Sequence, residues 1–476
     1  MKFCNKEVFD KIDAYIYANK DRILEDLVTM IRVPSVKGEP SEGAPYGVEC
    51  DRMLVEANAL YQRHGFSGKI NHEGGYAVSY YGDGEKTIGL LSHGDVVPAD
   101  GEWLMCPPFE PVIRDGYIFG RGCNDDKSGI LETVYAAEII RELGFDLKSR
   151  LVMVTGVNEE SGMGDIKAFV ENEPMPDLSL VPDGGYPCYS GEATIIRFKL
   201  ISERKFEKIQ KIYGGKACNI ILGEVTAEIT YDEKLWKQIE NACRENERVN
   251  ASCNGDTITV VAKGEQSHVI APEKSLNAGK VLADALTGCD ALGENDIEIL
   301  RSARVFLTDG YGTGLGISAE DKDFGRLVCG NGIIATTEDG ALDLYFDIRM
   351  GLSLDINELK NTLQGIDGWE YCEERCDEGY CLSEDAPARA LAEKTYFAVS
   401  GIDAKGEMIS GGTHVRRMKN AVAVGTVGYY KAKPIDLPVG HGGVHQPDEK
   451  MSLDGFFEAI KILTCTIMEA DAMLNE

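Results

Sequence analysis

Three short apolar segments near the start of the chain constrain its fold most, because helix-like stretches separate them. The segments are TIGLLSHGDVV (residues 87–97), RLVMVTGVNEE (150–160) and LSLVPDGG (178–185). Each has the length of a buried strand, whereas residues 130–144 and 166–173 carry apolar side chains at helical spacing. Strands that alternate with helices predict an α/β domain built on a largely parallel central sheet.

Residues that can bind metal ions lie at the ends of these strands. In such sheets, ligands bind beyond the carboxyl ends of the strands, which meet at one edge. A pair of divalent ions needs carboxylate oxygens and neutral imidazoles, with one carboxylate between the ions. Two histidines and three carboxylates of the chain meet that need: His93, Asp125, Glu160, Asp183 and His445.

The length of 476 residues exceeds what one hydrophobic core usually supports, so we expect two domains or a large insertion. Past residue 190 the sequence changes to alternating strand patterns mixed with helices, which indicates an α+β module. Residues 421–430 return to a buried-strand pattern, and residues 453–469 follow as a helix. The sequence therefore predicts one domain in two parts, 1–188 and 385–476, interrupted by an inserted α+β domain at 189–384.

The net charge of -30 comes from 49 basic and 79 acidic residues. This excess argues against nucleic acid and against an anionic membrane as partners, because both would be repelled. The first residues lack the apolar run of a signal peptide, and no stretch approaches the ~20 apolar residues of a membrane span. A cytoplasmic location is therefore expected.

Six motifs occur in a fixed order: SHGDVVPAD, GRGCNDDKSG, NEESG, VPDGGYP, GGTHVRR and HQPDE. With them the chain resembles, over nearly its whole length, the di-zinc hydrolase family of aminoacylase, succinyl-diaminopimelate desuccinylase and glutamate carboxypeptidase. Within that family the likeness is strongest to the dipeptidase V group. The resemblance implies a zinc-peptidase-type fold and a metallopeptidase that hydrolyses dipeptides with a free N-terminus. It also implies two divalent metal ions, with zinc expected and manganese or cobalt as alternatives.

The resemblance assigns the metal ligands position by position. His93 would bind one ion, and Asp125 would bridge both ions. Glu160 and His445 would complete the ligands of the first ion, and Asp183 would complete those of the second. The peptide bond after the bridging aspartate is often cis in the family, so we expect a cis bond after Asp125.

Two further residues of the same motifs would support the chemistry. Asp95 would lie behind His93 and fix its tautomer and orientation. Glu159 would be the general base that takes a proton from the attacking water. Because neighbouring side chains of a strand point to opposite sides, Glu159 and Glu160 are expected to face in different directions.

The final metal-binding histidine is ambiguous from the sequence, since His441 and His445 lie four residues apart. The family pattern is a histidine followed by a glutamate four residues later, which selects His445 with Glu449. His441 is then expected in a loop or behind the ligands. His64 and His72 match no motif and are expected on the surface.

The middle region resembles the lid segments of the family. His268 would stabilise the oxyanion that forms during attack, and Asn219 would contact substrate. Arg349 would bind the substrate carboxylate, a task that suits the planar fork of arginine. Arg416 is a second substrate contact or a surface ion pair. His414 stands where relatives often have an aromatic or acidic residue, and we expect it to touch substrate.

The predicted lid is nearly twice as long as the simple dimerisation domain of many relatives. Members of the dipeptidase V group use such a doubled lid to complete the site within one chain, so a working monomer is expected. Two alternatives remain: an N-acyl-amino-acid amidohydrolase or desuccinylase with the same site, and a non-catalytic metal-binding scaffold. Glu159 and Asp95 speak against the scaffold, because a metal binder needs neither a base nor an orienting residue.

Overall fold

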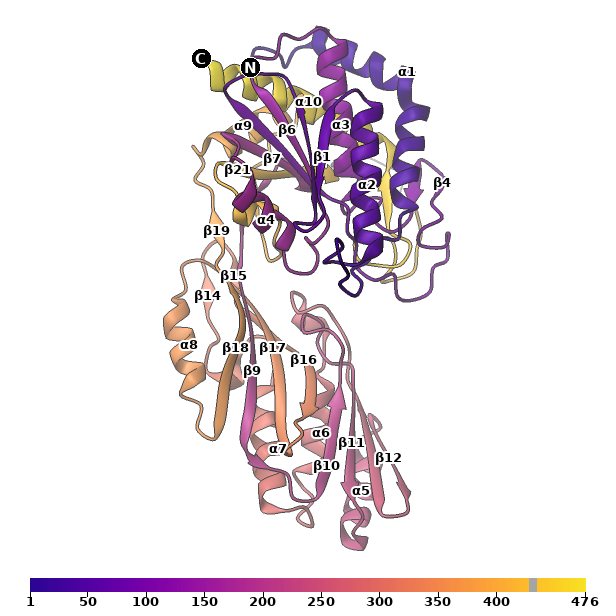
Figure 1. Cartoon of the computed structure of the whole chain (residues 1–476). Coiled ribbons are helices and arrows are strands. Elements are labelled where there is room, and N and C mark those ends of the chain that lie inside the picture. The colour runs from indigo at the N-terminus through magenta and orange to yellow at the C-terminus, as the bar shows by residue number, and fades with distance from the viewer. Residues whose placement is uncertain (428–434) are drawn as a thin grey trace. The chain divides into compact units, whose positions relative to one another are not determined.

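The computed structural model describes residues 1–427 and 435–476, and it divides the chain into two compact units (Figure 1). Unit 1 comprises Met1–Gly191, Leu382–Glu407 and Gly412–Glu476. Unit 2 comprises Glu192–Cys381 and Met408–Gly411. Unit 1 is thus assembled from separate stretches of the chain.

Unit 1 is built on a sheet whose order is β1-β2-β6-β3-β7-β21-β8. The four central strands β6, β3, β7 and β21 pair in parallel, and the flanking strands pair antiparallel. The predicted α/β class is confirmed, but the sheet is mixed, with the parallel pairing confined to its centre. Its strands are β1 (Ser67–Asn71), β2 (Tyr76–Tyr81), β3 (Thr87–His93), β6 (Arg150–Gly156), β7 (Leu178–Gly185), β8 (Tyr189–Glu192) and β21 (Ala421–Val427).

Helices pack against this sheet and against one another. The helix that follows the metal-binding motif, α3, is buried along nearly its whole length because it lies against β3 and α10. The helices are α1 (Lys6–Ile31), α2 (Val48–Arg63), α3 (Lys127–Glu142), α4 (Gly164–Asn172), α9 (Pro387–Ser400), η3 (His414–Arg417) and α10 (Leu453–Asn475). A small separate sheet holds β4 (Val112–Arg114), β5 (Tyr117–Phe119) and β22 (Lys450–Ser452).

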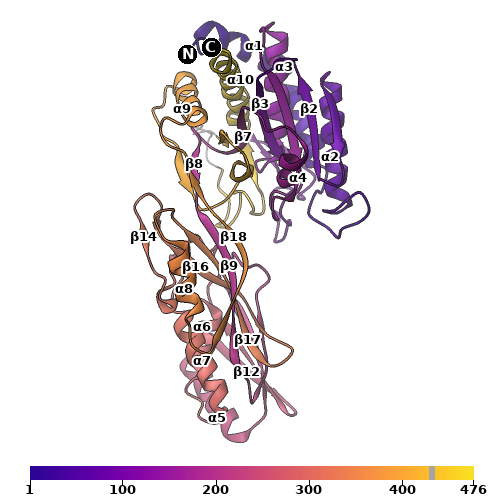
Figure 2. The same ribbon diagram turned by 60° about the vertical axis from the view of Figure 1, so that its left-hand side comes forward.

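Unit 2 is an antiparallel sheet of order β12-β13-β11-β10-β16-β17-β9-β18, with helices α5 to α8 along one face (Figure 2). Its main strands are β9 (Thr194–Lys205), β10 (Ile209–Gly214), β11 (Glu224–Thr230), β12 (Val249–Asn254), β13 (Thr257–Lys263), β16 (Val328–Thr336), β17 (Ala341–Met350) and β18 (Trp369–Asp377). Its helices are α5 (Glu233–Glu245), α6 (Ala278–Leu286), α7 (Glu294–Phe306) and α8 (Ile356–Gln364). The short elements of unit 2 are η1 (Pro272–Lys274), η2 (Thr313–Leu315), β14 (Glu320–Asp321) and β15 (Gly325–Arg326). Two further short strands, β19 (Tyr380–Cys381) and β20 (Glu407–Ile409), lie where the chain passes from one unit to the other.

Alternation along the strands of unit 2 separates an apolar face from a polar one. In β9, Phe198 and Leu200 are fully buried in the core of unit 2, whereas Arg197 and Lys199 between them are partly exposed. This period of two places the charged side chains on the face that points away from the core.

The strand predicted over residues 421–430 is present as β21 up to Val427, and its last three residues lie outside the described part of the chain. The predicted helix over 453–469 is confirmed within α10. Among the described helices, none has the length and apolar character needed to cross a membrane.

The surface position expected for His64 was wrong, because only 4% of this residue is exposed. The residue ends α2, and its ring lies between α1 and α3. Nδ1 is 2.7 Å from Oε2 of Glu138, and Nε2 is 3.1 Å from Oδ2 of Asp26. Other charged and polar groups complete the network around the two carboxylates: Arg22, Arg63, Tyr135 and Arg141. No local motif reveals the site, since its two carboxylates come from distant segments.

The protonation of His64 therefore matters for stability. Burial lowers the pKa of His64, but its hydrogen bonds with Asp26 and Glu138 outweigh burial, so the pKa lies above 6.5. A raised pKa in the folded state means that the stabilisation is complete below the unfolded value of ~6.5. It is lost as the pH rises through the raised pKa of the folded protein.

Replacing His64 with glutamine should lower the free energy of unfolding by ~1.5 to 3 kcal/mol in mildly acidic solution, as expected for charged hydrogen bonds. The difference from the parent should shrink as the pH rises through the raised pKa of His64, because the imidazolium is then lost in the parent too. Thermal unfolding across that pH range measures this gap. His72→Gln is the control, since the His72 side chain is 47% exposed although it also pairs with an aspartate. A gap that stays constant with pH would contradict the ionic role of His64.

Candidate metal centre and active site

The parallel centre of the sheet in unit 1 delivers several predicted site residues to one edge. β3 ends at His93, and the neighbouring parallel strand β7 carries Asp183 near its carboxyl end. Asp125 lies in the loop that opens α3, and His445 lies in the loop before β22. Segments that are far apart in the sequence thus converge at the carboxyl ends of parallel strands, as such sheets favour.

Asp125 presents each of its two carboxylate oxygens to a different histidine. Oδ1 lies 3.1 Å from Nε2 of His93, and Oδ2 lies 3.0 Å from Nε2 of His445. The same nitrogen of His445 lies 3.1 Å from Oε1 of Glu160. Asp125 therefore stands between two groups of potential ligands. The bond between Asp125 and Asp126 is cis, as predicted.

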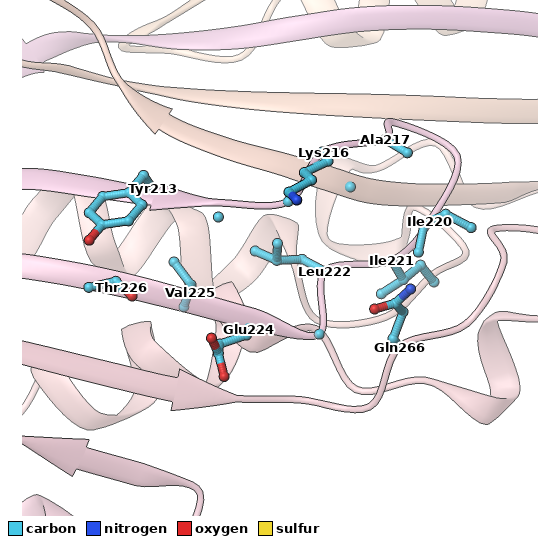
Figure 3. Close-up of a pocket in the computed structure, with 14 residues that line it drawn as sticks. Tyr213, Lys216, Ala217, Ile220, Ile221, Leu222, Glu224, Val225, Thr226 and Gln266 are labelled. Atoms are coloured by element: carbon cyan, nitrogen blue, oxygen red, sulfur yellow. The ribbon is translucent and has the colours of Figure 1, made fainter. Parts of the chain in front are cut away.

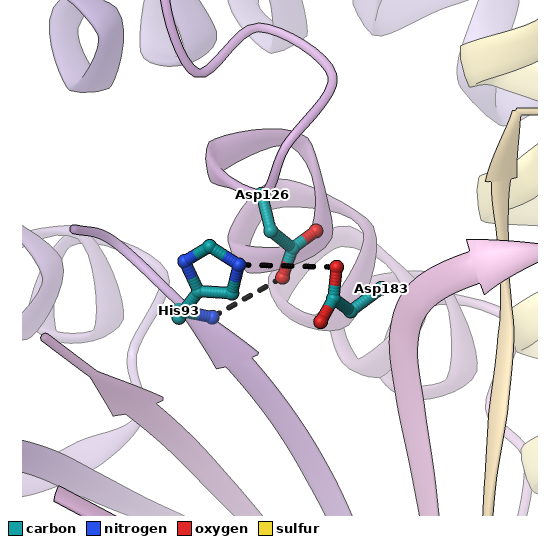
Figure 4. A group of neighbouring side chains, drawn as sticks. All are labelled: His93, Asp126 and Asp183. Atoms are coloured by element: carbon teal, nitrogen blue, oxygen red, sulfur yellow. Dashed lines mark hydrogen bonds and ion pairs between the residues drawn. The ribbon is translucent and has the colours of Figure 1, made fainter. Parts of the chain in front are cut away.

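Two further acids, Asp126 and Asp183, lie beside His93 (Figure 4). Nε2 of His93 lies 3.8 Å from Oδ1 of Asp183, and the backbone N–H of His93 donates to Oδ2 of Asp126 at 3.1 Å. Asp126 is fully buried. The sequence analysis gave Asp126 no role, and the doubled aspartate of its motif was the signal available for it.

Asp95 lies behind His93 and also contacts the turn that carries Glu159 and Glu160. The closest acceptor for Nδ1 of His93 is the backbone carbonyl of Asp95 at 3.0 Å, while the Asp95 carboxylate is 3.5 Å away. That carboxylate accepts the backbone N–H groups of Glu159 at 3.1 Å and Glu160 at 3.2 Å. The two glutamates lie in a turn after β6, so strand alternation was the wrong reason for their different directions. A buried carboxylate holds the turn instead.

Glu449 organises the loop that carries Asp125. Its carboxylate accepts backbone N–H groups from Gly122 at 3.1 Å, Asn124 at 3.0 Å and Asp125 at 3.2 Å. Arg121 donates to the same carboxylate at 2.7 Å, and both side chains are fully buried. The loop conformation around Asp125 thus depends on one buried, multiply bonded carboxylate.

Negative charge exceeds positive charge in this cluster. Burial raises the pKa of Glu160 to about 7 and raises that of Glu159 well above its ordinary range. Burial and neighbouring carboxylates likewise raise the pKa of Asp126 and of Asp183. Although burial opposes it, hydrogen bonding to Asp125 and Glu160 raises the pKa of His445 to about 11. Carboxylates resist ionisation here unless a positive charge joins them.

Several buried polar atoms of the cluster make no hydrogen bond of good geometry within residues 1–427 and 435–476: Nε2 of His93, Oδ1 of Asp126 and Oε1 of Glu159. Leaving such atoms without a partner costs ~1 to 3 kcal/mol each. Imidazole nitrogens and carboxylate oxygens are ligands that divalent ions such as zinc accept. Two sets of ligand atoms lie within 4.8 Å of one another: His93, Asp126 and Asp183, and His93, Asp125 and Glu160. The residues therefore fit divalent metal ions.

His414 lies directly behind this cluster. It is 2% exposed, its ring centroid is 6.2 Å from that of His93, and its Nε2 is 3.4 Å from Oδ2 of Asp165. A side chain at Gly156 would meet Asp165 Oδ2 at 2.1 Å and the His414 ring at 3.1 Å, so only glycine fits there. Asp165 also accepts the backbone N–H of Asn158 at 2.8 Å, which ties His414 to the glutamate turn.

Two other predicted positions lie outside the metal-ligand groups. Nδ1 of His441 is 2.6 Å from Oδ2 of Asp448. The other carboxylate oxygen, Oδ1, accepts the backbone N–H groups of Leu104 and Met105. His441 is therefore part of a loop anchor. Arg416 lies in η3, two residues after His414, and is partly exposed.

The remaining predicted residues belong to unit 2. Nδ2 of Asn219 is 3.4 Å from Nε2 of His268, and the backbone N–H of Val269 donates to the Asn219 carbonyl at 2.9 Å. Arg349 is 5% exposed and donates to the carboxylate of Asp347 at 2.6 and 3.2 Å. The sequence analysis did not name Asp347, whose position two residues before Arg349 on one strand was the available signal.

A pocket of ≈ 370 Å³ lies on the loop that carries Asn219 (Figure 3). Its lining includes Tyr213, Lys216, Leu222 and Gln266. Ala217 and Ile220, on either side of the Asn219 segment, also line it. Asn219 itself is not among the lining residues, so this pocket borders the loop without containing the predicted substrate contact.

Replacing Glu449 with glutamine should weaken metal binding by ~10- to 100-fold, as for other residues that hold metal ligands. The amide would keep the shape of the side chain, but its NH₂ group would face backbone N–H donors and could not accept their hydrogen bonds. Calorimetric titration of the metal-free protein with zinc measures the affinity, and Glu110→Gln, at an exposed residue, is the control. Unchanged affinity in Glu449→Gln would show that the loop holds its shape without this carboxylate.

Comparison with known proteins connects this geometry to a family. The sequence matches the family described as peptidase family M20/M25/M40 over residues 89–469. A Beta-Ala-Xaa dipeptidase of Lactobacillus delbrueckii subsp. lactis is 27% identical over 473 residues, which cover 95% of this chain and 96% of that protein.

Solved structures share the fold. The crystal structure of human carnosine dipeptidase 1 matches with a TM-score of 0.58 and 15% identity, covering 98% of this chain and 99% of that one. The di-peptidase Dug1p of Saccharomyces cerevisiae matches with a TM-score of 0.58 and 13% identity, covering 98% of both chains. The family match spans most of the sequence and includes the carboxylate and histidine cluster. The chain therefore belongs to peptidase family M20/M25/M40, and it is a hydrolase of the metallopeptidase class.

Proposed function

We propose that the protein is a dipeptidase that uses two divalent metal ions, zinc by preference, to hydrolyse dipeptides with a free N-terminus. The observation that carries the proposal is the placement of Asp125, whose two oxygens lie 3.1 Å from His93 and 3.0 Å from His445. A carboxylate with one imidazole beside each of its oxygens can bridge a pair of metal ions. The dipeptidase names of the compared proteins support the substrate class.

The distances suggest how the ligands would divide. His93, Asp183 and Oδ1 of Asp125 would hold one ion, while Glu160, His445 and Oδ2 of Asp125 would hold the other. The sequence-based grouping differs, since it placed His93 on one ion with Glu160 and His445, and ligand atoms of His93, Asp125 and Glu160 also lie within 4.8 Å of one another. Asp126 would support the first group through its hydrogen bond to the backbone of His93.

When bound, the ions supply positive charge that lowers the pKa of a water molecule and polarises the substrate carbonyl. Glu159 would accept a proton from the attacking water and return it to the leaving amine. The residue is only 9% exposed, and burial raises its pKa, which favours a group that takes up a proton and later releases it. The Asp95 carboxylate would hold the backbone of Glu159 during both transfers.

Unit 2 would supply groups that recognise the substrate and the developing charge. His268 would donate a hydrogen bond to the oxyanion, and its ring lies beside the Asn219 amide, which would contact the peptide. Arg349 would bind the C-terminal carboxylate with its guanidinium group. In unit 1, His414 and Arg416 would shape the substrate site.

A panel of dipeptides, tripeptides and N-acyl amino acids, assayed with zinc, manganese or cobalt, tests the substrate class. Dipeptides with a free N-terminus should be hydrolysed with the highest kcat/KM, and N-acetylated dipeptides should be poor substrates. Preferred cleavage of N-acyl or N-succinyl amino acids would contradict the dipeptidase proposal and favour an amidohydrolase on the same site.

Native mass spectrometry of the zinc-loaded protein should show two ions per chain. Asp125→Ala should lose both, because each ion would lose the carboxylate that it shares. Asp100→Ala, which removes an exposed aspartate from the loop after β3, should keep both ions and serves as the control. Two retained ions in Asp125→Ala would remove the bridging role.

We further propose that one chain carries all the catalytic groups and works as a monomer. Glu159→Gln should lose ~100- to 10,000-fold in turnover as a missing general base, and His268→Ala ~100- to 1,000-fold as a missing oxyanion donor. Both variants should keep their metal ions. A mixture of the two should stay inactive under conditions that allow subunit exchange. Recovered activity on mixing would mean that two chains share their active sites.

A further inference from the structure

A buried carboxylate in unit 2 holds two arginines at once. Asp347 is fully buried on β17, and Arg197 is its direct cross-strand partner on β9. Nε of Arg197 donates to Oδ2 of Asp347 at 2.8 Å. Arg349 donates to both oxygens of Asp347, Nε to Oδ1 at 2.6 Å and Nη2 to Oδ2 at 3.2 Å. One carboxylate thus fixes two guanidinium groups side by side.

The two arginines differ in how many donors they still offer. Nη1 of Arg349 donates to the backbone carbonyl of Ser410 at 2.8 Å, so three of its five N–H groups are engaged. The Arg197 side chain is 25% exposed, and within the described residues its terminal nitrogens have no hydrogen-bond partner. Arg197 therefore presents its two terminal nitrogens, partly exposed, beside the Arg349 guanidinium, whose position is fixed.

The charge of this cluster is not balanced. Two guanidinium groups share one carboxylate, which leaves one positive charge. On the adjacent strand β18, Arg375 is the cross-strand partner of Arg197. Arg375 forms an ion pair with Asp377, so these two side chains add no net charge. A single carboxylate would neutralise the excess, and such charge-assisted pairs are the strong hydrogen bonds of proteins.

The cluster lies on the face of the sheet that also carries the predicted substrate residues of unit 2. Gly330 of β16 pairs with Asp347, and a Cβ built on Gly330 would meet Val269 at 2.6 Å and Ile221 at 3.0 Å. Residues paired directly across strands point to the same face. The segments that contain His268 and Asn219 therefore pack over the face that holds both arginines.

We propose that Arg197 is a second carboxylate-binding residue, beside Arg349, for the C-terminus of the peptide, and that Asp347 is the positioning residue for both. The inference rests on the proposed dipeptidase function and adds two residues to it. Asp347 would keep the guanidinium groups close together despite their mutual repulsion. Arg197 would supply the free donors, and Arg349 the fixed charge.

Kinetics on alanyl-alanine and its C-terminal amide test this role. Arg197→Gln should raise the KM for the free acid roughly 10- to 100-fold, the loss expected for a charge-assisted hydrogen bond, and change kcat little. Hydrolysis of the amide should stay as in the parent. Arg197→Lys should recover part of the loss, because it restores the charge without the planar fork. Asp347→Asn should also reduce the ratio of kcat/KM for the free acid to kcat/KM for the amide.

Lys199→Gln is the matched control, because Lys199 lies two residues along the same strand and pairs with Glu374 at 2.9 Å and Asp343 at 4.0 Å. It should leave the ratio of free-acid to amide hydrolysis unchanged. An unchanged ratio in Arg197→Gln would overturn the proposal, and so would an equal change in both variants, which would indicate a long-range charge effect. Circular dichroism verifies folding, and the Arg197 variants decide the question if Asp347→Asn does not fold.

The outcome separates this inference from the proposed function. Hydrolysis of alanyl-alanine with no effect of Arg197→Gln contradicts only the role of Arg197. Absence of dipeptide hydrolysis in the parent contradicts the proposed function, and calorimetric titration with the same two peptides then decides on Arg197. Tighter binding of the free acid than of the amide by the parent, with a smaller difference between the two affinities in Arg197→Gln, supports the proposed role of Arg197. Equal binding of both peptides by the parent, or no binding of either, overturns it.

Discussion

The structure of unit 1 depends on accommodating several carboxylates at one buried edge of a sheet. Asp125, Asp126, Glu160 and Asp183 lie close to His93 and His445. Burial raises the pKa of Asp126, Glu160 and Asp183, whereas hydrogen bonds to the two histidines outweigh burial at Asp125 and hold its pKa below the usual range. Divalent cations resolve this conflict, since they bring the positive charge that the cluster lacks. The surrounding residues can then be understood as the means by which the chain holds like charges together until the cations bind.

Backbone N–H groups bound to buried carboxylates do much of this work. Glu449 holds the Asp125 loop, Asp95 holds the glutamate turn, and Asp165 ties that turn to His414. Asp347 has the corresponding task in unit 2, where it fixes two arginines instead of a loop. In each case a hydrogen-bonded carboxylate holds in place another group for which we propose a role in binding metal or substrate.

The sequence predicted the centre of the fold better than its edges. The parallel strands β3, β6 and β7 are continuous apolar runs, and such runs identify buried strands locally. β2 went unpredicted and lies antiparallel beside β6, because its pairing depends on contacts with a strand more than 60 residues away in sequence. The ligand residues were recognisable because they lie within ordered motifs. Asp126 and Asp347 lie beside predicted residues in the sequence, but their hydrogen bonds to His93 and to the two arginines were not predicted. Asp165 was not recognisable, because its contacts with His414 and with the backbone of Asn158 form only in the folded chain. His64 was misjudged for the same reason, since Asp26 and Glu138 meet it only in the folded chain.

The central claim is that Asp125 lies between two metal ions. Anomalous diffraction at the zinc absorption edge, from crystals of the zinc-loaded protein, tests it most directly. The account predicts two zinc peaks in the cluster, one beside His93 and Asp183 and the other beside Glu160 and His445, with an oxygen of Asp125 on each. A single peak, or two peaks of which one does not contact Asp125, would contradict it.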